Sequence, residues 1–146
     1  TQSRSSAASD VYKRQQVRVA SWQAHELRLH LPLQANCNLH DSMFGGSLYC
    51  GVLLAGWGWL HLRLQEENLQ GAVVIKDAQI SYLMPVTEDA QALCSAPEPA
   101  QWDRFVAIFQ RRGLARLQLE SQVLTAGGEV AARFSGQFVL QRESAG

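Results

Sequence analysis

Two adjacent glycines, Gly45 and Gly46, stand at the expected start of a helix, where their backbone N–H groups could do chemistry. The first turn of a helix has N–H groups without intrahelical acceptors and carries the positive end of the helix dipole. Because neither glycine has a side chain, a substrate carbonyl oxygen could approach these donors closely and be stabilised as it gains negative charge. The alternative is that both glycines only let the helix pack tightly against a strand.

Polar side chains before this glycine pair could supply a base and further hydrogen bonds. Asp41 could activate a water molecule, or could form the N-terminal cap of the helix together with Ser42. Asn36 and Asn38 could hold the water or the substrate, or could simply form turns. His40 could carry a proton near neutral pH, or could be a solvated loop residue.

Other common catalytic patterns do not occur. The sequence has no Walker-type loop, no G-x-S-x-G motif and no metal-ligand spacing. Its three cysteines, Cys37, Cys50 and Cys94, form no C-x-x-C pair, which predicts reduced thiols in a cytoplasmic protein, with Cys50 and Cys94 as inert apolar filler. Lys plus Arg and Asp plus Glu number 13 each, so we expect neither nucleic acid nor a membrane as partner. The missing dinucleotide and metal-ligand motifs predict that the protein has no metal and no cofactor.

The helix that begins at the glycine pair is unusually apolar. Residues 43–62 contain no Asp, Glu, Lys or Arg, a length that could span a bilayer. However, this segment has five glycines together with Ser47 and His61, and no basic cluster flanks it. We therefore expect a core helix that a sheet surrounds, ending near Arg63.

The remaining elements are predicted from alternating apolar and polar residues and from turn residues. Strands are expected at residues 17–31, 72–84, 90–96 (an edge strand), 117–123 and 130–141, and a short helix at 102–109 that ends at Gly113. Val74, Ala78, Ile80, Tyr82 and Met84 should share one face of the second strand, and Gly127-Gly128 should form a hairpin turn. The pattern predicts an α+β fold in which a curved antiparallel sheet wraps around one long apolar helix.

The chain of 146 residues is long enough for one domain. We expect that domain at residues 16–146, preceded by a tail at residues 1–15 (TQSRSSAASDVYKRQ) that has no role in the fold. Because the predicted sheet leaves open edges, pairing two copies edge to edge would cover them, which favours a homodimer or homotetramer.

Three segments together resemble a known family: NCNLHDSMFGGSLYCGVLLAGWGWL, ISYLMPV at residues 80–86, and FQRRGLARLQLESQV. They are similar to the thioesterase family of the hotdog superfamily whose domain is fused behind GNAT-type acetyltransferases in some bacterial proteins. The resemblance covers roughly residues 20–142 and implies a hotdog fold that acts on acyl thioesters.

The resemblance also implies roles for residues. Many hotdog thioesterases have an acid on the helix at the position that Leu53 occupies here, so Asp41 becomes the candidate base, with Gly46 and a neighbouring N–H as oxyanion donors. Ser47 could polarise the carbonyl or bond back to the helix, and Tyr82 could face the acyl tunnel or pack in the core. Arg111 and Arg112, with nearby Arg116, could contact the phosphates of coenzyme A or an acidic carrier protein, or be a solvated helix end.

Three functions remain open from the sequence. The first is a thioesterase acting on acyl-CoA or acyl-carrier-protein substrates in fatty acid metabolism. The second is a non-hydrolytic module that binds acyl thioesters, which Leu53 favours. The third is a hydratase or dehydratase of the same fold, for which His40 and Asp41 would have to serve.

Overall fold

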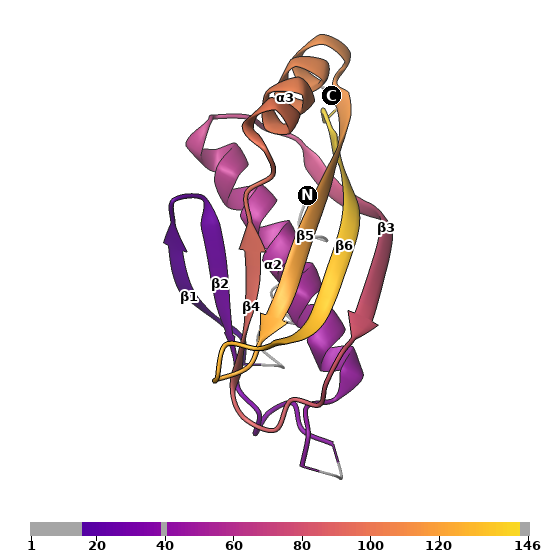
Figure 1. Ribbon diagram of the computed structural model, residues 1–146. Helices are drawn as coiled ribbons and strands as arrows, with labels where there is room; N and C mark the ends of the chain where they lie inside the picture. Colours follow the sequence, from indigo (N-terminus) through magenta and orange to yellow (C-terminus); the bar gives the residue numbers. More distant parts are fainter. Residues whose placement is uncertain (1–15, 39–40, 144–146) are drawn as a thin grey trace.

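The computed structural model describes residues 16–38 and 41–143; the predicted tail at residues 1–15 and His40 lie outside this part. Six strands and two helices lie within it, shown in Figure 1. Their bounds, in chain order, are β1 Arg18–Gln23, β2 Glu26–Leu31, α2 Gly45–Glu66, β3 Ala72–Tyr82, β4 Ala90–Ser95, α3 Pro99–Arg112, β5 Leu114–Leu124 and β6 Val130–Gln141.

The strands form one antiparallel sheet in the order β1-β2-β4-β5-β6-β3, which curves around α2 (Figure 1). Helix α2 is buried on the side that faces the sheet and partly buried elsewhere, which explains why its sequence is apolar almost all round. This architecture confirms the predicted α+β fold. In the described part of the chain, neither helix has both the length and the hydropathy that crossing a membrane would require.

Three glycines inside α2 let the helix approach the sheet closely. A Cβ added at Gly51 or Gly58 would lie 2.9 Å from the side chain of Leu31 or Leu27, and one at Gly56 would lie 2.9 Å from the Phe138 ring. These contacts are too short for a carbon atom, so larger residues here would push α2 away from β2 and β6. The tight-packing explanation therefore applies to the glycines within the helix.

The prediction of a single strand at residues 17–31 was wrong, because β1 and β2 form a hairpin. Its two-residue turn, Ala24-His25, has φ values of 52° and 56°, a conformation that residues other than Gly, Asn and Asp rarely adopt. The turn therefore lacked the usual sequence signal. It is supported instead from the core, since the Trp59 indole N–H donates to the His25 carbonyl oxygen at 2.7 Å.

Two further expectations about the sheet also need correction. The predicted edge strand at residues 90–96 is β4, which lies between β2 and β5, because the hairpin of β1 and β2 extends the sheet on that side. In β3, a bulge between Ile75 and Asp77 changes the alternation, so that Val73, rather than Val74, packs against the core with Ala78 and Ile80.

The predictions for the C-terminal half are confirmed. Helix α3 buries Trp102, Phe105 and Phe109 and ends at Gly113, whose φ of 75° is the left-handed conformation of a glycine helix stop. Gly128, with φ of 87°, lies in the turn between β5 and β6. Helix α3 lies at the C-terminal end of α2, and the N-terminal end of α2 lies near the end of β3 (Figure 1).

Candidate active site

The start of α2 presents two backbone donors. Phe44 is the N-cap residue, and the N–H groups of Ser47 and Leu48 donate to its carbonyl oxygen at 2.9 and 3.1 Å. Gly45 and Gly46, the first two helical residues, have N–H groups without an acceptor in residues 16–38 and 41–143. With the helix dipole, these two N–H groups form a site suited to a developing negative charge on a carbonyl oxygen.

Neither glycine of this pair is required by packing against the sheet. A Cβ at Gly45 would lie 3.5 Å from the Tyr82 ring, an ordinary contact, and one at Gly46 would meet only the ring of Phe44. Phe44 is 59% exposed and can move. What the missing side chains provide here is open access to the backbone.

Asp41 does not cap the helix, so the predicted cap of Asp41 and Ser42 was wrong. The N-cap residue is Phe44, three residues later, and its side chain makes no cap hydrogen bond. The helix begins later because the Met43 N–H first donates to the Val86 carbonyl oxygen at 2.7 Å. The Asp41 backbone has φ of 56°, and its exposed carboxylate has no hydrogen bond or ion pair to any described residue. Its role as a base stays a prediction.

The two asparagines hold the loop that leads into α2. Asn36 is buried, and its side-chain Nδ2 donates to the Pro32 carbonyl oxygen at 2.8 Å. The backbone carbonyl oxygen of Asn36 accepts the Phe44 N–H at 2.8 Å. Asn38 accepts the N–H and the hydroxyl of Ser42 on Oδ1, both at 3.2 Å. Both residues therefore have the turn roles that the sequence left open, and their predicted contacts with substrate stay predictions.

Tyr82 connects the end of β3 to the glycine pair. Its hydroxyl donates to the Gly45 carbonyl oxygen at 2.9 Å, while the residue is 53% exposed. Core packing, one of the two roles considered for Tyr82, therefore does not apply. The bond fixes the first turn of α2 against β3, and the exposed ring forms a wall beside the free N–H groups.

The other predicted site residues are not gathered at this point. Ser47 is half-buried in the first turn, beside the glycine pair. Arg111 and Arg112 are exposed in the last turn of α3, at the opposite end of α2 from Gly45 (Figure 1). Leu53, at the position of the usual acid, is half-buried and apolar.

Of the three free cysteines, Cys37 is exposed, Cys50 is half-buried and Cys94 is buried. Cys94 is fully buried, and burial raises the pKa of its thiol to about 12, which keeps it protonated. This agrees with its predicted role as inert filler. No group of three or more His, Cys, Asp or Glu side chains in the described chain could hold a metal ion.

A polar cluster at the far end of α2 was not anticipated from the sequence. The His25 ring accepts a hydrogen bond from Arg63 on Nδ1 at 2.7 Å and contacts Glu66 through Nε2 at 3.0 Å. The Trp22 indole N–H donates to Glu66 at 2.8 Å, and the indole N–H of Trp102 donates to Glu67 at 2.9 Å. The cluster joins three elements, and no short sequence spacing could have revealed it.

Comparisons with known proteins agree with this description. The family model described as "Putative thioesterase (yiiD_Cterm)" matches residues 10–142. The structure is similar to a protein of unknown function from Chlorobaculum tepidum, with 28% identity and a TM-score of 0.88 over 94% of this chain and 90% of that one. It is also similar to a putative thioesterase from Shewanella oneidensis, with 34% identity and a TM-score of 0.77 over 90% and 88%. A thioesterase from Haemophilus influenzae shares the fold at 12% identity, with a TM-score of 0.71 over 91% and 84%.

Proposed function

The chain belongs to the putative thioesterase family and has the hotdog fold, and from this we propose that it hydrolyses thioesters of acyl groups carried on coenzyme A or on acyl carrier protein. The observation that supports this most directly is the pair of N–H groups at Gly45 and Gly46, which have no acceptor in the described part of the chain. Such donors are needed wherever a carbonyl oxygen becomes an oxyanion.

The proposed reaction uses the residues around that pair. The thioester carbonyl oxygen accepts the N–H groups of Gly45 and Gly46, with Ser47 close by. A water molecule, held with the help of Asn36 and Asn38, attacks the carbonyl carbon, and the Asp41 carboxylate takes its proton. The tetrahedral oxyanion then collapses, the C–S bond breaks, and the leaving sulfur takes up a proton, so that one carboxylic acid and one thiol are formed.

A homodimer is part of the same proposal. Strand β3 is an edge strand of 11 residues, and the exposed apolar side chains of Ile75, Tyr82 and Leu83 lie on it or directly after it. A long, apolar, unpaired edge is a template for another strand, and an antiparallel edge can pair with itself around a two-fold axis. A second copy would cover this edge beside Tyr82 and so enclose the acyl group.

The experiment that tests the function measures thiol release from short- to long-chain acyl-CoAs and acyl carrier proteins. Gly45→Pro removes one N–H donor at the first helical position, where proline is tolerated, and the extended ψ of 136° at Phe44 suits the residue before a proline. Gly45→Ala adds a similar Cβ but keeps the N–H. We expect a loss of about 100- to 1000-fold in kcat for Gly45→Pro and little change for Gly45→Ala. Equal activities in the two variants would remove Gly45 from the oxyanion site.

The same assay tests the base with Asp41→Asn, which keeps the size of the side chain. We expect turnover to fall by about 100-fold or more, since a general base contributes that much. Turnover that survives the change would keep the thioesterase and assign the proton to another group.

A non-hydrolytic binding module is the second candidate, and Leu53 favours it. A half-buried leucine where related enzymes have an acid leaves the helix without a carboxylate on that face. In this case acyl-CoA would bind to the wild-type protein without release of thiol, and Gly45→Pro would weaken binding only.

A further inference from the structure

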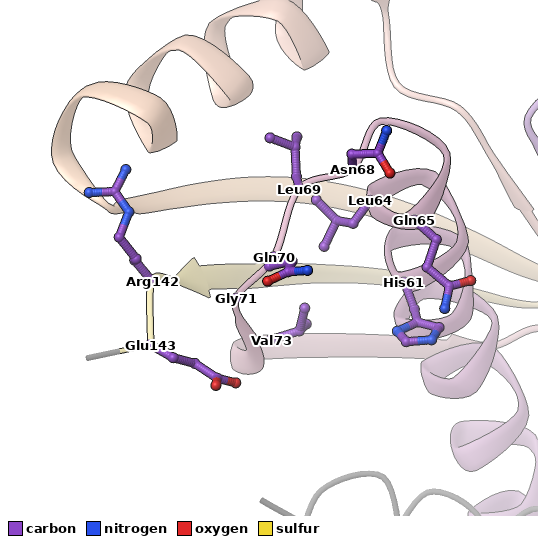
Figure 2. Close-up of a pocket in the computed structure, with 10 residues that line it drawn as sticks. All are labelled: His61, Leu64, Gln65, Asn68, Leu69, Gln70, Gly71, Val73, Arg142 and Glu143. Atoms are coloured by element: carbon purple, nitrogen blue, oxygen red, sulfur yellow. The ribbon is translucent and has the colours of Figure 1, made fainter. Parts of the chain in front are cut away.

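A pocket of about 690 Å³ lies at the C-terminal end of α2, away from the glycine pair. Figure 2 shows Gln65 extending from α2 on one side and Gln70 from the segment that enters β3 on the other. Asn68 adds a third carboxamide, and the guanidinium of Arg142 is held by two carbonyl oxygens of α3 at 3.1 and 3.3 Å. Carboxamides both donate and accept hydrogen bonds, so they select no particular charge in a ligand.

A second pocket, of about 360 Å³, lies on the outer face of the sheet, away from α2. The side chains of β2 alternate, so that its leucines are buried in the core while Arg28 and His30 point to the outer face. Across the sheet, Gln91 of β4 pairs with both His30 and Leu124 of β5. The volume is within the range of small-molecule sites. This outer pocket is also lined by Asp89 and, from the turn between β5 and β6, by Thr125, Ala126 and Gly128.

Arg28 offers the outer pocket a positive group with donors to spare. Its Nε donates to Glu26 at 3.2 Å and its Nη1 donates to the side-chain oxygen of Gln91 at 3.1 Å. These two bonds hold the guanidinium in place, while Nη2 makes no hydrogen bond to any described residue. A guanidinium has five N–H donors, so Arg28 can still bind a carboxylate group.

Asp89 offers the same pocket a negative group with an accessible oxygen. Its Oδ1 accepts the Leu33 N–H at 2.8 Å. Its Oδ2 lies 3.5 Å from Nε2 of His30, which is longer than a good hydrogen bond. Because the Asp89 side chain is 59% exposed, a ligand can reach Oδ2. An ammonium group would supply the strong donor that this oxygen lacks.

The two charged groups together favour a ligand that carries both charges. A pure anion would be repelled by the Asp89 carboxylate, and a pure cation would be repelled by the Arg28 guanidinium. A zwitterion can satisfy both groups at once. Leu124 and Ala126 add apolar surface to the same pocket. A free amino acid with an aliphatic side chain combines an ammonium, a carboxylate and an apolar group.

Hydrogen bonds also connect Asp89 to the start of α2. The Leu33 N–H donates to Asp89, and the Leu33 carbonyl oxygen accepts the Asn36 N–H at 2.9 Å. The backbone carbonyl oxygen of Asn36 in turn accepts the N–H of Phe44, the N-cap residue, at 2.8 Å. The glycine pair follows directly. A ligand that holds the Asp89 side chain in place therefore also steadies the segment that precedes the glycine pair.

We propose that the outer pocket binds a free aliphatic amino acid, whose carboxylate contacts Arg28 and whose ammonium contacts Asp89. The bound amino acid orders Asp89, strengthens the hydrogen bonds between Asp89 and Phe44, and so orders the first turn of α2. Binding itself goes beyond the proposed function and does not depend on it. Only the consequence for thioester turnover rests on the proposed function.

The first test follows the backbone amide signals of His30 and Gln91 by NMR while leucine, isoleucine, valine or methionine is added. The tightest binder is then compared with its N-acetyl derivative, which lacks the ammonium, and with its carboxamide, which lacks the carboxylate. We expect saturable shifts with the amino acid and roughly ten-fold weaker binding of each derivative, because each has lost one charge-assisted hydrogen bond. No saturable shift with any of the four, or equal affinities for the tightest binder and its derivatives, would overturn the proposal.

Variants assign the two charges in the same titration. Asp89→Asn removes the charge but keeps an oxygen for the Leu33 N–H, and Arg28→Gln removes the guanidinium. Asp103→Asn and Arg133→Gln, at exposed positions of α3 and β6, are the matched controls. We expect each pocket variant to bind the amino acid about ten-fold more weakly and both controls to bind it as the wild-type protein does. Unchanged affinity in Asp89→Asn and Arg28→Gln would overturn the assignment.

The second test measures whether binding reaches α2. Saturation with the amino acid should slow hydrogen exchange of the Leu33 and Phe44 amides by roughly 3- to 10-fold, about the effect of one neutral hydrogen bond. The amide of Gly113, which donates to Phe109 at the end of α3, is the control and should not change. Unchanged exchange at Phe44 in the bound protein would overturn the connection to α2.

Both tests are separate from the function itself, since neither uses a thioester. A wild-type protein that releases no thiol from any acyl thioester would reject the thioesterase. The amino acid site would still be accepted or rejected by the titration and by the hydrogen exchange.

Discussion

At the scale of the residue, the described part of the core contains one hydroxyl group, that of Ser121, that lacks a strong hydrogen bond. Ser121, in β5, is 1% exposed, and its Oγ makes no hydrogen bond to a nitrogen or oxygen atom of a described residue. It has a weak interaction with the thiol of Cys94. It lies opposite Cys94 in the sheet and 3.7 Å from the position that a Cβ on Gly56 would take. A buried hydroxyl without a partner costs about 1 to 3 kcal/mol relative to solvent.

We therefore expect Ser121→Ala to raise the free energy of unfolding by about 1 kcal/mol, the lower end of that penalty, because the methyl group fills nearly the same space. Urea denaturation followed by tryptophan fluorescence measures this change. Ser135→Ala is the matched control: its hydroxyl accepts a hydrogen bond from Gln118, so its loss should not stabilise the protein. A destabilised Ser121→Ala variant would show that this hydroxyl is satisfied in solution.

At the scale of the element, Glu66 at the end of α2 binds the hairpin of β1 and β2 through polar contacts with Trp22 and His25. The Trp22 indole N–H lowers the pKa of this carboxyl below its usual 4.5, helped by His25 and Arg63. A carboxyl group whose pKa is lower in the folded than in the unfolded state stabilises the fold at pH values above its unfolded pKa. This stabilisation is lost as the pH falls through the pKa of the folded state.

Accordingly, the wild-type protein should lose part of its stability on going from about pH 7 to about pH 3.5, and Glu66→Gln should lose less. The exposed Glu88 has no ion pair with a described residue, so Glu88→Gln should follow the wild type. Urea denaturation of the three proteins at both pH values measures the differences. The same pH dependence in all three would show that Glu66 does not fasten the hairpin.

At the scale of the whole molecule, the pairing through β3 predicts a particle of twice the chain mass of 16.2 kDa. The two-fold axis of an antiparallel pair can pass between Lys76 and Asp77, the charged residues of β3, and so place each of them opposite the other in the second copy. In that register Lys76→Glu would place two pairs of like charges across the axis and weaken association by roughly ten-fold, from about 1 kcal/mol or slightly more in total. Reversal of both charges with Lys76→Glu and Asp77→Lys together should restore the dimer. Light scattering over a dilution series measures the dimer, and a monomeric wild-type protein would contradict the pairing through β3.

The resemblance and the residue pattern were enough to predict the fold class, the long apolar helix and the strands of the C-terminal half. They failed at the turn Ala24-His25, at the bulge in β3 and at the N-cap of α2. In each case the local sequence lacks its usual signal, because contacts distant in the chain support an otherwise unfavourable conformation. The bond from Trp59 to the His25 carbonyl oxygen is the clearest example.

For the candidate site, the sequence by itself determined where the helix with the accessible N–H groups begins. The glycine pair and the absence of charged residues are both local properties of residues 43–62. Only the tertiary structure decided that Tyr82 reaches Gly45, that Asp41 is not a cap, and that a pocket lined by carboxamides lies at the opposite end of α2. The reason is physical: periodicity and turn residues record which face of an element is buried. Pockets and polar contacts depend instead on which elements become neighbours, and that is decided by packing the whole chain.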